Sequence, residues 1–116
     1  MKILITGSGG YIGKNLKEYL DRKYFLYTPS RQELDLLDSN SVSNYFKSHK
    51  IDIVIHTALT GGSRAEEQEK NALHNNLTIF FNIVRNEKYF KRMIHFGSGA
   101  EYDKRFPIIN IILNTF

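Results

Sequence analysis

Glycines that follow a short apolar run are the residues of this chain best suited to bind a ligand. The segment Ile3–Gly13 reads Ile-Leu-Ile-Thr-Gly-Ser-Gly-Gly-Tyr-Ile-Gly, in which Gly7, Gly10 and Gly13 recur every three residues. Glycine admits positive φ and lets a ligand approach bare backbone. A helix that begins here presents free N–H groups and the positive end of its dipole to an anion. The order of strand, glycine turn and helix therefore predicts a site for the diphosphate of a dinucleotide.

The remaining glycines also follow apolar runs. Gly61, Gly62, Gly97 and Gly99 each come shortly after one, so all 8 glycines of the chain share this placement. In an open α/β sheet, ligands bind beyond the carboxyl ends of the strands. We therefore expect the glycine-rich loops to gather at one edge of a sheet. Ser98, which lies between two of these glycines, is either ordinary turn material or a catalytic hydroxyl at that edge.

Four apolar runs alternate with helical patterns along the chain. This predicts an α/β fold, a Rossmann-like doubly wound parallel sheet of about four strands in three α/β/α layers. We expect strands at residues 3–5, 25–28, 51–56 and 93–96. Asp38 or Ser39 is available to cap the middle helix. The predicted buried faces of the three helices are Ile12, Leu16, Tyr19 and Leu20; Val42, Tyr45 and Phe46; and Leu73, Leu77, Phe80, Phe81 and Val84.

The composition fits one small globular domain. Of 116 residues, 41% are hydrophobic and none is cysteine, which excludes thiolate metal sites and suits the cytoplasm. We find neither a signal peptide nor a run long enough to span a membrane. The net charge of +4 comes from scattered Lys and Arg side chains, so we do not expect nucleic-acid binding. The four histidines lack metal-ligand spacing, and we expect His56 and His95 to satisfy local hydrogen bonds instead of holding a metal.

Residue 31 bears on the choice of cofactor. An acidic side chain about 20 residues beyond the glycines binds the ribose hydroxyls of NAD, whereas an arginine there accommodates the 2′-phosphate of NADP. Arg31 stands at this place, and Glu33 follows two residues later. We favour Arg31 and NADP because a guanidinium suits a phosphate monoester. NAD held by Glu33 is the alternative.

Together these motifs resemble the extended short-chain dehydrogenase/reductases, the NAD-dependent epimerase/dehydratase family that acts on nucleotide sugars. The resemblance runs from residue 2 to about residue 107. The segments that carry it are Thr6–Gly13, Arg31–Asp38, Asp52–Gly62, Asn76–Asn82 and Phe96–Asp103. Residues 33–38 and 56–62 look most like the GDP-L-fucose synthases within this family.

The resemblance implies a set of site residues. The cofactor would contact Gly7, Gly10, Tyr11, Ile12, Gly13, Arg31, Asp35, Leu36, Ala58, Leu59 and Asn76. Ser98 would polarise a sugar keto group during hydride transfer. The family's proton donor, a Tyr four residues before a Lys on the helix after this Ser, has no counterpart. Tyr19 and Lys23 have the spacing but belong to the first helix, and Phe106 stands four residues after Tyr102.

We therefore interpret the chain as the cofactor-binding part of an NAD(P)-dependent oxidoreductase or epimerase that acts on a nucleotide-activated sugar, inactive by itself. A stand-alone, non-catalytic dinucleotide-binding module is the alternative. Residues 1–107 would form the NAD(P)-binding domain, and residues 108–116 an apolar tail that is either an edge strand or the mark of a truncated chain. We expect a nucleotide sugar as partner and neither nucleic acid nor membrane. The sugar, its nucleotide and whether the chain forms a homodimer are left open.

Overall fold

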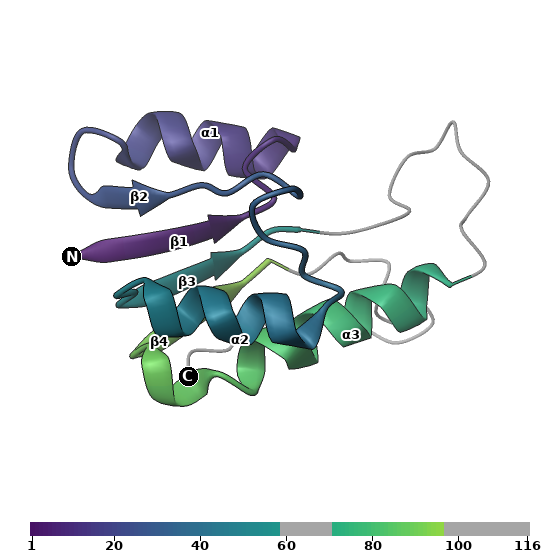
Figure 1. Ribbon diagram of the computed structural model, residues 1–116. Coiled ribbons are helices and arrows are strands. Elements are labelled where there is room, and N and C mark those ends of the chain that lie inside the picture. Colours follow the sequence, from purple (N-terminus) through teal and green to yellow (C-terminus); the bar gives the residue numbers. More distant parts are fainter. Residues whose placement is uncertain (59–70, 97–116) are drawn as a thin grey trace, which may run out of the picture.

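The computed structural model describes residues 1–58 and 71–96 of the chain, along which strands and helices alternate (Figure 1). The strands are β1 (Lys2–Thr6), β2 (Phe25–Tyr27), β3 (Ile53–His56) and β4 (Arg92–His95). The helices are α1 (Tyr11–Leu20), α2 (Ser39–Ser48) and α3 (Ala72–Val84), followed by the short 3-10 helix η1 (Glu87–Tyr89). Within this described part, no helix has the length and apolarity needed to cross a bilayer.

The four strands form one parallel sheet in the order β2-β1-β3-β4. β1 lies between β2 and β3, so the chain leaves β1 toward one edge and then crosses back to its other side. The carboxyl ends of β1 and β3 therefore mark the switch point at which open α/β sheets bind ligands. The expected doubly wound parallel sheet is confirmed.

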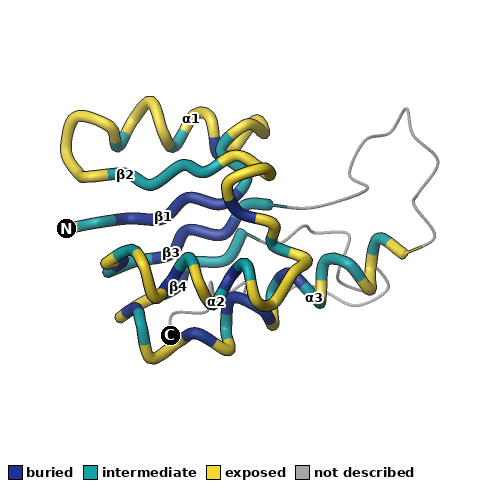
Figure 2. The backbone as a smooth tube through the Cα atoms, in the orientation of Figure 1, coloured by how far each residue is buried: buried dark blue, intermediate teal, exposed yellow. Residues whose placement is uncertain are grey.

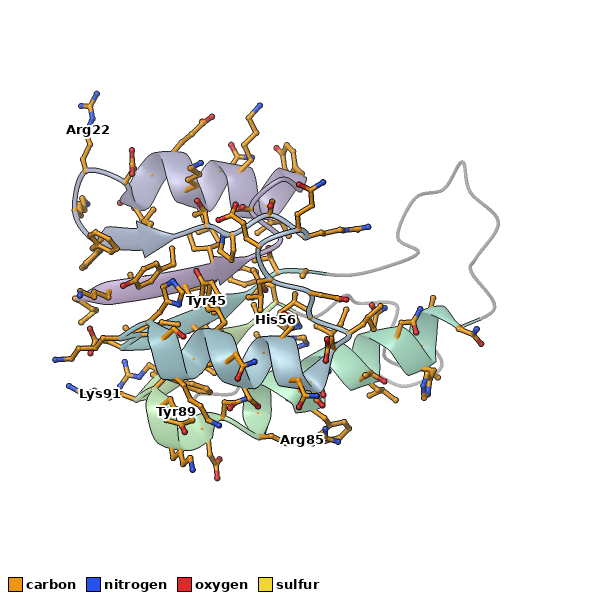
Figure 3. All side chains as sticks on the ribbon, viewed as in Figure 1. Arg22, Tyr45, His56, Arg85, Tyr89 and Lys91 are labelled. Carbon is orange, nitrogen blue, oxygen red and sulfur yellow. The ribbon has the colours of Figure 1, made fainter. Side chains whose placement is uncertain are left out.

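Helices cover both faces of this sheet, α1 one face and α2 with α3 the other, which gives the three expected layers (Figure 1). The central strands β1 and β3 are the most buried elements, β2 is only partly buried, and the outer surfaces of the helices are exposed (Figure 2). Charged side chains such as Arg22 and Lys91 point outward into solvent (Figure 3). None of the Lys and Arg side chains within residues 1–58 and 71–96 is buried.

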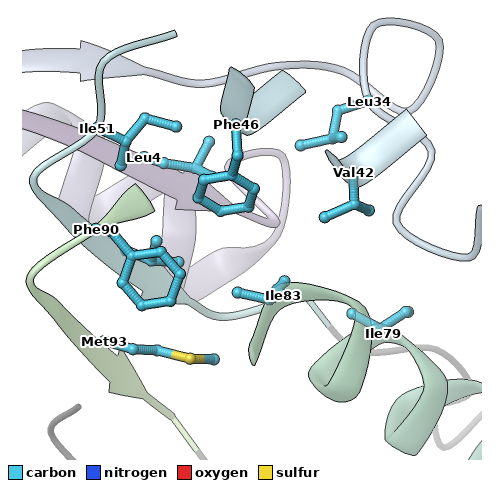
Figure 4. Packing of buried hydrophobic residues seen from close by; sticks show 10 residues of the cluster. Leu4, Leu34, Val42, Phe46, Ile51, Ile79, Ile83, Phe90 and Met93 are labelled. Carbon is cyan, nitrogen blue, oxygen red and sulfur yellow. The ribbon is translucent and has the colours of Figure 1, made fainter. Parts of the chain in front are cut away.

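Two apolar clusters fill the spaces between the layers. Under α1, Leu16 and Leu20 contact Ile3, Ile5 and Ile55 of the sheet. On the other face a larger cluster joins α2 and α3 to the sheet (Figure 4). Its buried members are Leu4, Leu34, Val42, Phe46, Ile51, Val54, Ile79, Ile83, Phe90 and Met93. Alternate residues of β1 thus serve opposite clusters, as the pleat of a strand dictates.

α1 has a narrower buried face than the sequence predicted. Gly13 is buried and Leu16 packs on the sheet. Ile12 and Tyr19, predicted for the same face, are 45% and 67% exposed. At about 100° per residue, both lie on the rim of the buried face and not at its centre. The assignment of Tyr19 to the apolar face is therefore wrong, and its ring instead has Lys23 Nζ 4.8 Å from its centroid.

α3 buries only part of the predicted face. Phe80 and Val84 pack partly buried against the core, as predicted, whereas Leu73, Leu77 and Phe81 are 75%, 47% and 50% exposed. The fully buried apolar residues are Ile79 and Ile83, so the centre of the buried face is rotated around the helix axis from the predicted centre. The helix carries two apolar stripes, and periodicity cannot tell which of them meets the sheet. Moreover, the first turns of α3 extend past the strand ends, where the sheet does not cover them (Figure 1).

α2 follows the sequence prediction. Val42 and Phe46 are buried and Tyr45 packs beside them. Asp38, and not Ser39, is the N-cap, because its Oδ1 accepts a 3.0 Å hydrogen bond from the backbone N–H of Asn40. Partial burial, with Glu33 as a lesser cause, raises the pKa of Tyr45 to about 12. This phenol therefore stays protonated and serves packing.

Candidate functional site

A cleft of about 320 Å³ opens at the carboxyl ends of β1, β2 and β3. It is lined by the turn after β1 (residues 6–9), by part of the segment after β2 (residues 28–31, 33, 34 and 36) and by Ala58 after β3. The cleft thus lies at the switch point of the sheet. The structure brings Gly7, Arg31, Leu36 and Ala58, all predicted for one site, together in its walls.

Two glycines shape the turn after β1 for steric reasons. Gly7 has a φ of +73°, and a Cβ placed on it would lie 2.7 Å from the backbone nitrogen of Ala58. A Cβ on Gly13 would overlap the carbonyl oxygen of Gly7. The helix α1 can therefore begin this close to the strand end only because residue 13 lacks a side chain. Gly10 differs, because the nearest atom to a Cβ placed there is Gly7 O at 3.4 Å, an ordinary contact.

The first turn of α1 leads away from this turn with its backbone accessible. Gly10 is the N-cap and has no side chain to cap the helix, and the first turn holds no acidic residue. The N–H of Gly10 donates to Gly7 O at 3.0 Å, so this amide is used within the turn. The side chains of Tyr11 and Ile12 are exposed. The backbone N–H groups of these two residues are what the helix end can offer an anion.

Arg31 and Glu33 both line the cleft but have different partners. Glu33 closes the turn that it shares with Ser30: its Oε1 accepts from the N–H of Ser30 at 3.2 Å, and its own N–H donates to Ser30 O at 3.1 Å. Arg31 is exposed and makes no ion pair with any carboxylate in residues 1–58 or 71–96. One carboxylate oxygen of Glu33 is thus engaged within the turn, whereas the guanidinium of Arg31 lies at the cleft without an ion pair among these residues.

Asp35 and Leu36 follow in the chain, and of these two Leu36 lines the cleft. Asp35 is exposed, and its Oδ1 accepts from the N–H of Leu37 at 3.1 Å. A hydrogen bond from α3 holds the backbone of Leu36, because its carbonyl oxygen accepts from Nδ2 of Asn82 at 2.9 Å. Asn82 is only 2% exposed, and its Oδ1 accepts in turn from Arg85 at 3.1 Å.

Sequence reasoning missed Asn82 and selected Asn76 instead. Asn76 lies in the first half of α3, partly buried. The available signal for Asn82 was a lone amide flanked by Phe81 and Ile83 in an apolar helix, because a buried amide needs a polar partner. The partner, a carbonyl 46 residues earlier in the chain, was not visible in the sequence.

The strand ends beneath the cleft are joined by side chains. Thr6 Oγ1 lies 2.7 Å from His56 Nδ1, and both residues are buried. Thr57 Oγ1 donates to Thr6 O at 2.6 Å, and the N–H groups of Thr57 and Ala58 lie 3.2 and 3.4 Å from Thr6 Oγ1. Burial, with the neighbouring His95 as a lesser cause, lowers the pKa of His56 to about 3. His56, labelled in Figure 3, is thus a neutral interior side chain.

His56 and His95, both at strand ends, were expected to satisfy local hydrogen bonds, and the structure differs between them. His56 satisfies a local hydrogen bond, as predicted. His95 stacks on His56 with ring centroids 5.2 Å apart and has the edge of Phe80 against it. Its buried Nδ1 has no hydrogen-bond partner in the described part of the chain, so the expectation for this atom is not met. Nor do the described residues contain a cluster of three His, Cys, Asp or Glu that could hold a metal ion.

Several predicted features lie outside the described residues. These are Leu59, Ser98, the glycines at positions 61, 62, 97 and 99, Tyr102 and the tail at residues 108–116. Tyr19 and Lys23, which have the spacing of a catalytic pair, lie at and beyond the last residues of α1, at the end of the helix opposite the cleft. They do not line it.

Comparison with known proteins agrees with this geometry. The sequence profile of the NAD dependent epimerase/dehydratase family matches residues 3–114. The chain is 36% identical over 109 residues to the GDP-L-colitose synthase of Yersinia pseudotuberculosis, with 90% of this chain and 35% of that protein covered. It is 28% identical over 109 residues to the GDP-L-fucose synthase of Escherichia coli, which covers 89% of this chain and 34% of that protein.

A solved structure shows the same fold. The GDP-mannoheptose C4 reductase from Campylobacter jejuni with NADP bound superposes with a TM-score of 0.82 at 32% identity, over 95% of this chain and 37% of that one. The chain thus spans about a third of the length of the proteins that it matches.

Proposed function

Because this chain belongs to the NAD dependent epimerase/dehydratase family, we propose that it forms the NADP-binding part of an enzyme that reduces or epimerises a GDP-activated keto sugar. The relatives support the substrate class, since their names share a GDP-sugar. One of the similar structures holds NADP, which supports the cofactor. A location in the cytoplasm stays a prediction from the composition.

One observation carries the proposal: the glycine turn at the switch point. Gly7 in the left-handed region and Gly13 against Gly7 O let α1 begin close to the turn that lines the cleft. Backbone amides at a helix start suit the two negative charges of a diphosphate. Gly10 has space around it that a side chain could occupy without overlap. Packing within the chain therefore does not require a glycine at that position, which supports a ligand against the turn.

The proposed preference for NADP rests on Arg31. Its guanidinium is exposed at the cleft, whereas the competing Glu33 uses its carboxylate to close the turn with Ser30. A phosphate monoester accepts two parallel hydrogen bonds from a guanidinium. The 2′-phosphate that distinguishes NADP from NAD would bind there. Leu36, which lines the cleft, and the adjacent Asp35 would flank the adenine.

For the reaction, bound NADPH would supply a hydride to the sugar carbon. Ala58 and Leu59 would line the nicotinamide end, and Ser98 would donate a hydrogen bond to the sugar carbonyl as negative charge develops there. The remaining group that such chemistry needs is a proton donor of suitable pKa. The chain has a Tyr four residues before a Lys only at Tyr19, away from the cleft. We therefore propose that these 116 residues bind the cofactor without turnover.

Titration of the chain with NADP, NAD and ADP, followed by calorimetry and by its melting temperature, tests the proposal. A ligand at 100 times its Kd stabilises the folded state by about 2.7 kcal/mol. We expect NADP to raise the melting temperature more than NAD at equal concentration. NMR shift changes should fall on the glycine turn. Absence of any shift with all three nucleotides, or shifts confined to another surface, would overturn the assignment.

A further inference from the structure

Thr6 and His56 lie in one row across the sheet. Thr6 of β1 pairs in register with His56 of β3, and His56 pairs with His95 of β4. Because the strands are parallel and in register, these side chains point to the same face, one step beyond the apolar row of Leu4 and Val54. The hydrogen bonds within this buried polar row depend on which atom carries each proton.

Among the residues that the structure describes, the hydroxyl proton of Thr6 has one acceptor. The N–H groups of Thr57 and Ala58 can only donate, so Thr6 Oγ1 accepts at 3.2 and 3.4 Å. The hydroxyl hydrogen is left over, and within the described residues only His56 Nδ1, at 2.7 Å, can accept it. Nδ1 of His56 must then carry no proton, which places the ring proton on Nε2.

From these contacts we propose that Thr6 and His56 act as a positioning pair, in which neutral, Nε2-protonated His56 orients the Thr6 hydroxyl so that its oxygen holds residues 57–58 against the glycine turn. The proposal rests on the proposed function, because it assigns the pair to the cofactor cleft. Thr6, Gly7 and Ala58 all line that cleft. Neither Thr6 nor His56 contacts reacting atoms.

The tight fit at Gly7 makes this positioning matter. The backbone of Ala58 lies so near Gly7 that a Cβ there would be 2.7 Å from its nitrogen. Thr57 adds a 2.6 Å bond from its hydroxyl to Thr6 O. If the Thr6 hydroxyl rotates away, the N–H of Thr57 keeps Thr6 O at 3.3 Å as an acceptor, but the N–H of Ala58 loses the hydroxyl oxygen, and Ala58 can shift. The space between the glycine turn and Ala58 then changes where the ligand enters.

NMR of the free chain tests the protonation state without any ligand. In ¹⁵N-histidine-labelled protein, we expect His56 to show a protonated Nε2 and an unprotonated Nδ1 from pH 8 to pH 5. In Thr6→Val the hydroxyl donor is gone, so the Nδ1 resonance should move toward that of a nitrogen without a hydrogen bond. A protonated Nδ1, or a His56 that titrates near pH 6.5, would overturn the proposal.

Paired variants then test the effect on the cleft. Thr6→Ser keeps the hydroxyl and His56→Asn keeps an acceptor oxygen, whereas Thr6→Val and His56→Leu remove them. We expect the latter two to weaken NADP about tenfold, the size of one buried hydrogen bond, and the former two to stay within about threefold. The double variant Thr6→Val/His56→Leu should bind as each single one does. Equal affinity across both pairs would refute the positioning role.

The two proposals fail in different ways. If the unsubstituted chain does not bind NADP, the proposed function falls. The tautomer of His56 is still measured in the free protein, and an Nδ1-protonated ring would refute the pair on its own. If NADP binds and the His56 ring has the expected tautomer, the NADP affinities of the variants show whether the Thr6–His56 contact affects the cleft.

Discussion

At the scale of single residues, Gly10 and Gly13 are three positions apart yet are glycines for different reasons. A side chain on Gly13 would overlap Gly7 O, whereas one on Gly10 meets only an ordinary 3.4 Å contact. The first constraint comes from the chain itself. The constraint at Gly10 does not come from the chain and would arise only if a ligand lies against the turn.

We therefore expect Gly13→Ala and Gly10→Ala to separate stability from binding. Gly13→Ala should lower the free energy of unfolding by about 1–3 kcal/mol, as overpacking does. Gly10→Ala should unfold like the unsubstituted chain but bind NADP more weakly. Urea unfolding followed by circular dichroism measures the first quantity and calorimetry the second. A Gly10→Ala variant with unchanged affinity would contradict a diphosphate at this turn.

Arg31 and Glu33 give a second test at this scale. Arg31→Ala should weaken NADP by about tenfold or more, because a charged hydrogen bond to phosphate is lost, and should leave NAD nearly unchanged. Glu33→Gln is the matched control, since its amide oxygen can still accept from Ser30. Affinities for both cofactors, measured by calorimetry, decide the matter. Equal loss of NADP and NAD in Arg31→Ala would remove Arg31 from the 2′-phosphate role.

At the scale of elements, α3 supports the cleft without lining it in the described structure. Asn82 reaches across to the carbonyl of Leu36. Asn82→Ala should lower the free energy of unfolding by about 1–3 kcal/mol, because a buried polar contact is left unpaired, and should weaken nucleotides that carry adenine. Asn44→Ala, at an exposed position of α2, is the control. Thermal unfolding with and without ADP measures both effects; an ADP affinity equal to that of the control would show that Leu36 needs no support.

The buried stripe of α3 can be tested directly. Ile83→Ala should cost about 2–5 kcal/mol of unfolding free energy, as large-to-small changes in cores do. Leu77→Ser, on the exposed stripe, should change it by within about 0.5 kcal/mol. Denaturant unfolding of the two variants gives the comparison. The opposite ranking would restore the face that the sequence favoured.

Sequence reasoning succeeded where the signal is local. The glycine turn, a cap at Asp38 or Ser39 and the parallel sheet all follow from neighbouring residues and short periods. It failed where the answer depends on what lies opposite. The two apolar stripes on α3 cannot be told apart in the sequence without knowing which of them packs on the sheet. On α1, Tyr19 and Leu16 both belong to the predicted apolar face, but only Leu16 is directed toward the sheet. The contacts of Thr6 with His56 and of Asn82 with Leu36 join residues 50 and 46 positions apart, which no local pattern reveals.

At the scale of the whole molecule, lower pH should destabilise the fold through His56. Its pKa is about 3 in the folded state, against 6.5 for an ordinary histidine. Between these values the unfolded chain binds more protons than the folded chain, so the free energy of unfolding rises with pH. The stabilisation is full above pH 6.5 and is lost as the pH falls toward 3. Asp52, whose pKa is lowered chiefly by the N–H of Lys2, adds a loss at still lower pH.

Urea unfolding at a series of pH values from 7.5 to 4.5 measures this dependence. His56→Asn cannot titrate in this range, so its free energy of unfolding should vary less with pH than that of the unsubstituted chain. Asp52→Asn should keep the same slope above pH 5, because its carboxyl titrates below that range. Parallel slopes for His56→Asn and the unsubstituted chain would show that His56 is not the responsible group.

The strand order has a consequence for how the cleft responds to an arriving molecule. β1 is bonded to strands on both sides, whereas β2 is a three-residue strand bonded to β1 alone. Amide hydrogens in β1, and in β3, which is also bonded on both sides, should therefore exchange with deuterium most slowly, and those of β2 much sooner. The wall formed by the glycine turn follows the central strand β1. The wall that carries Arg31 follows the edge strand β2. We therefore expect the second wall to move when different ligands bind, while the backbone of the glycine turn keeps its conformation.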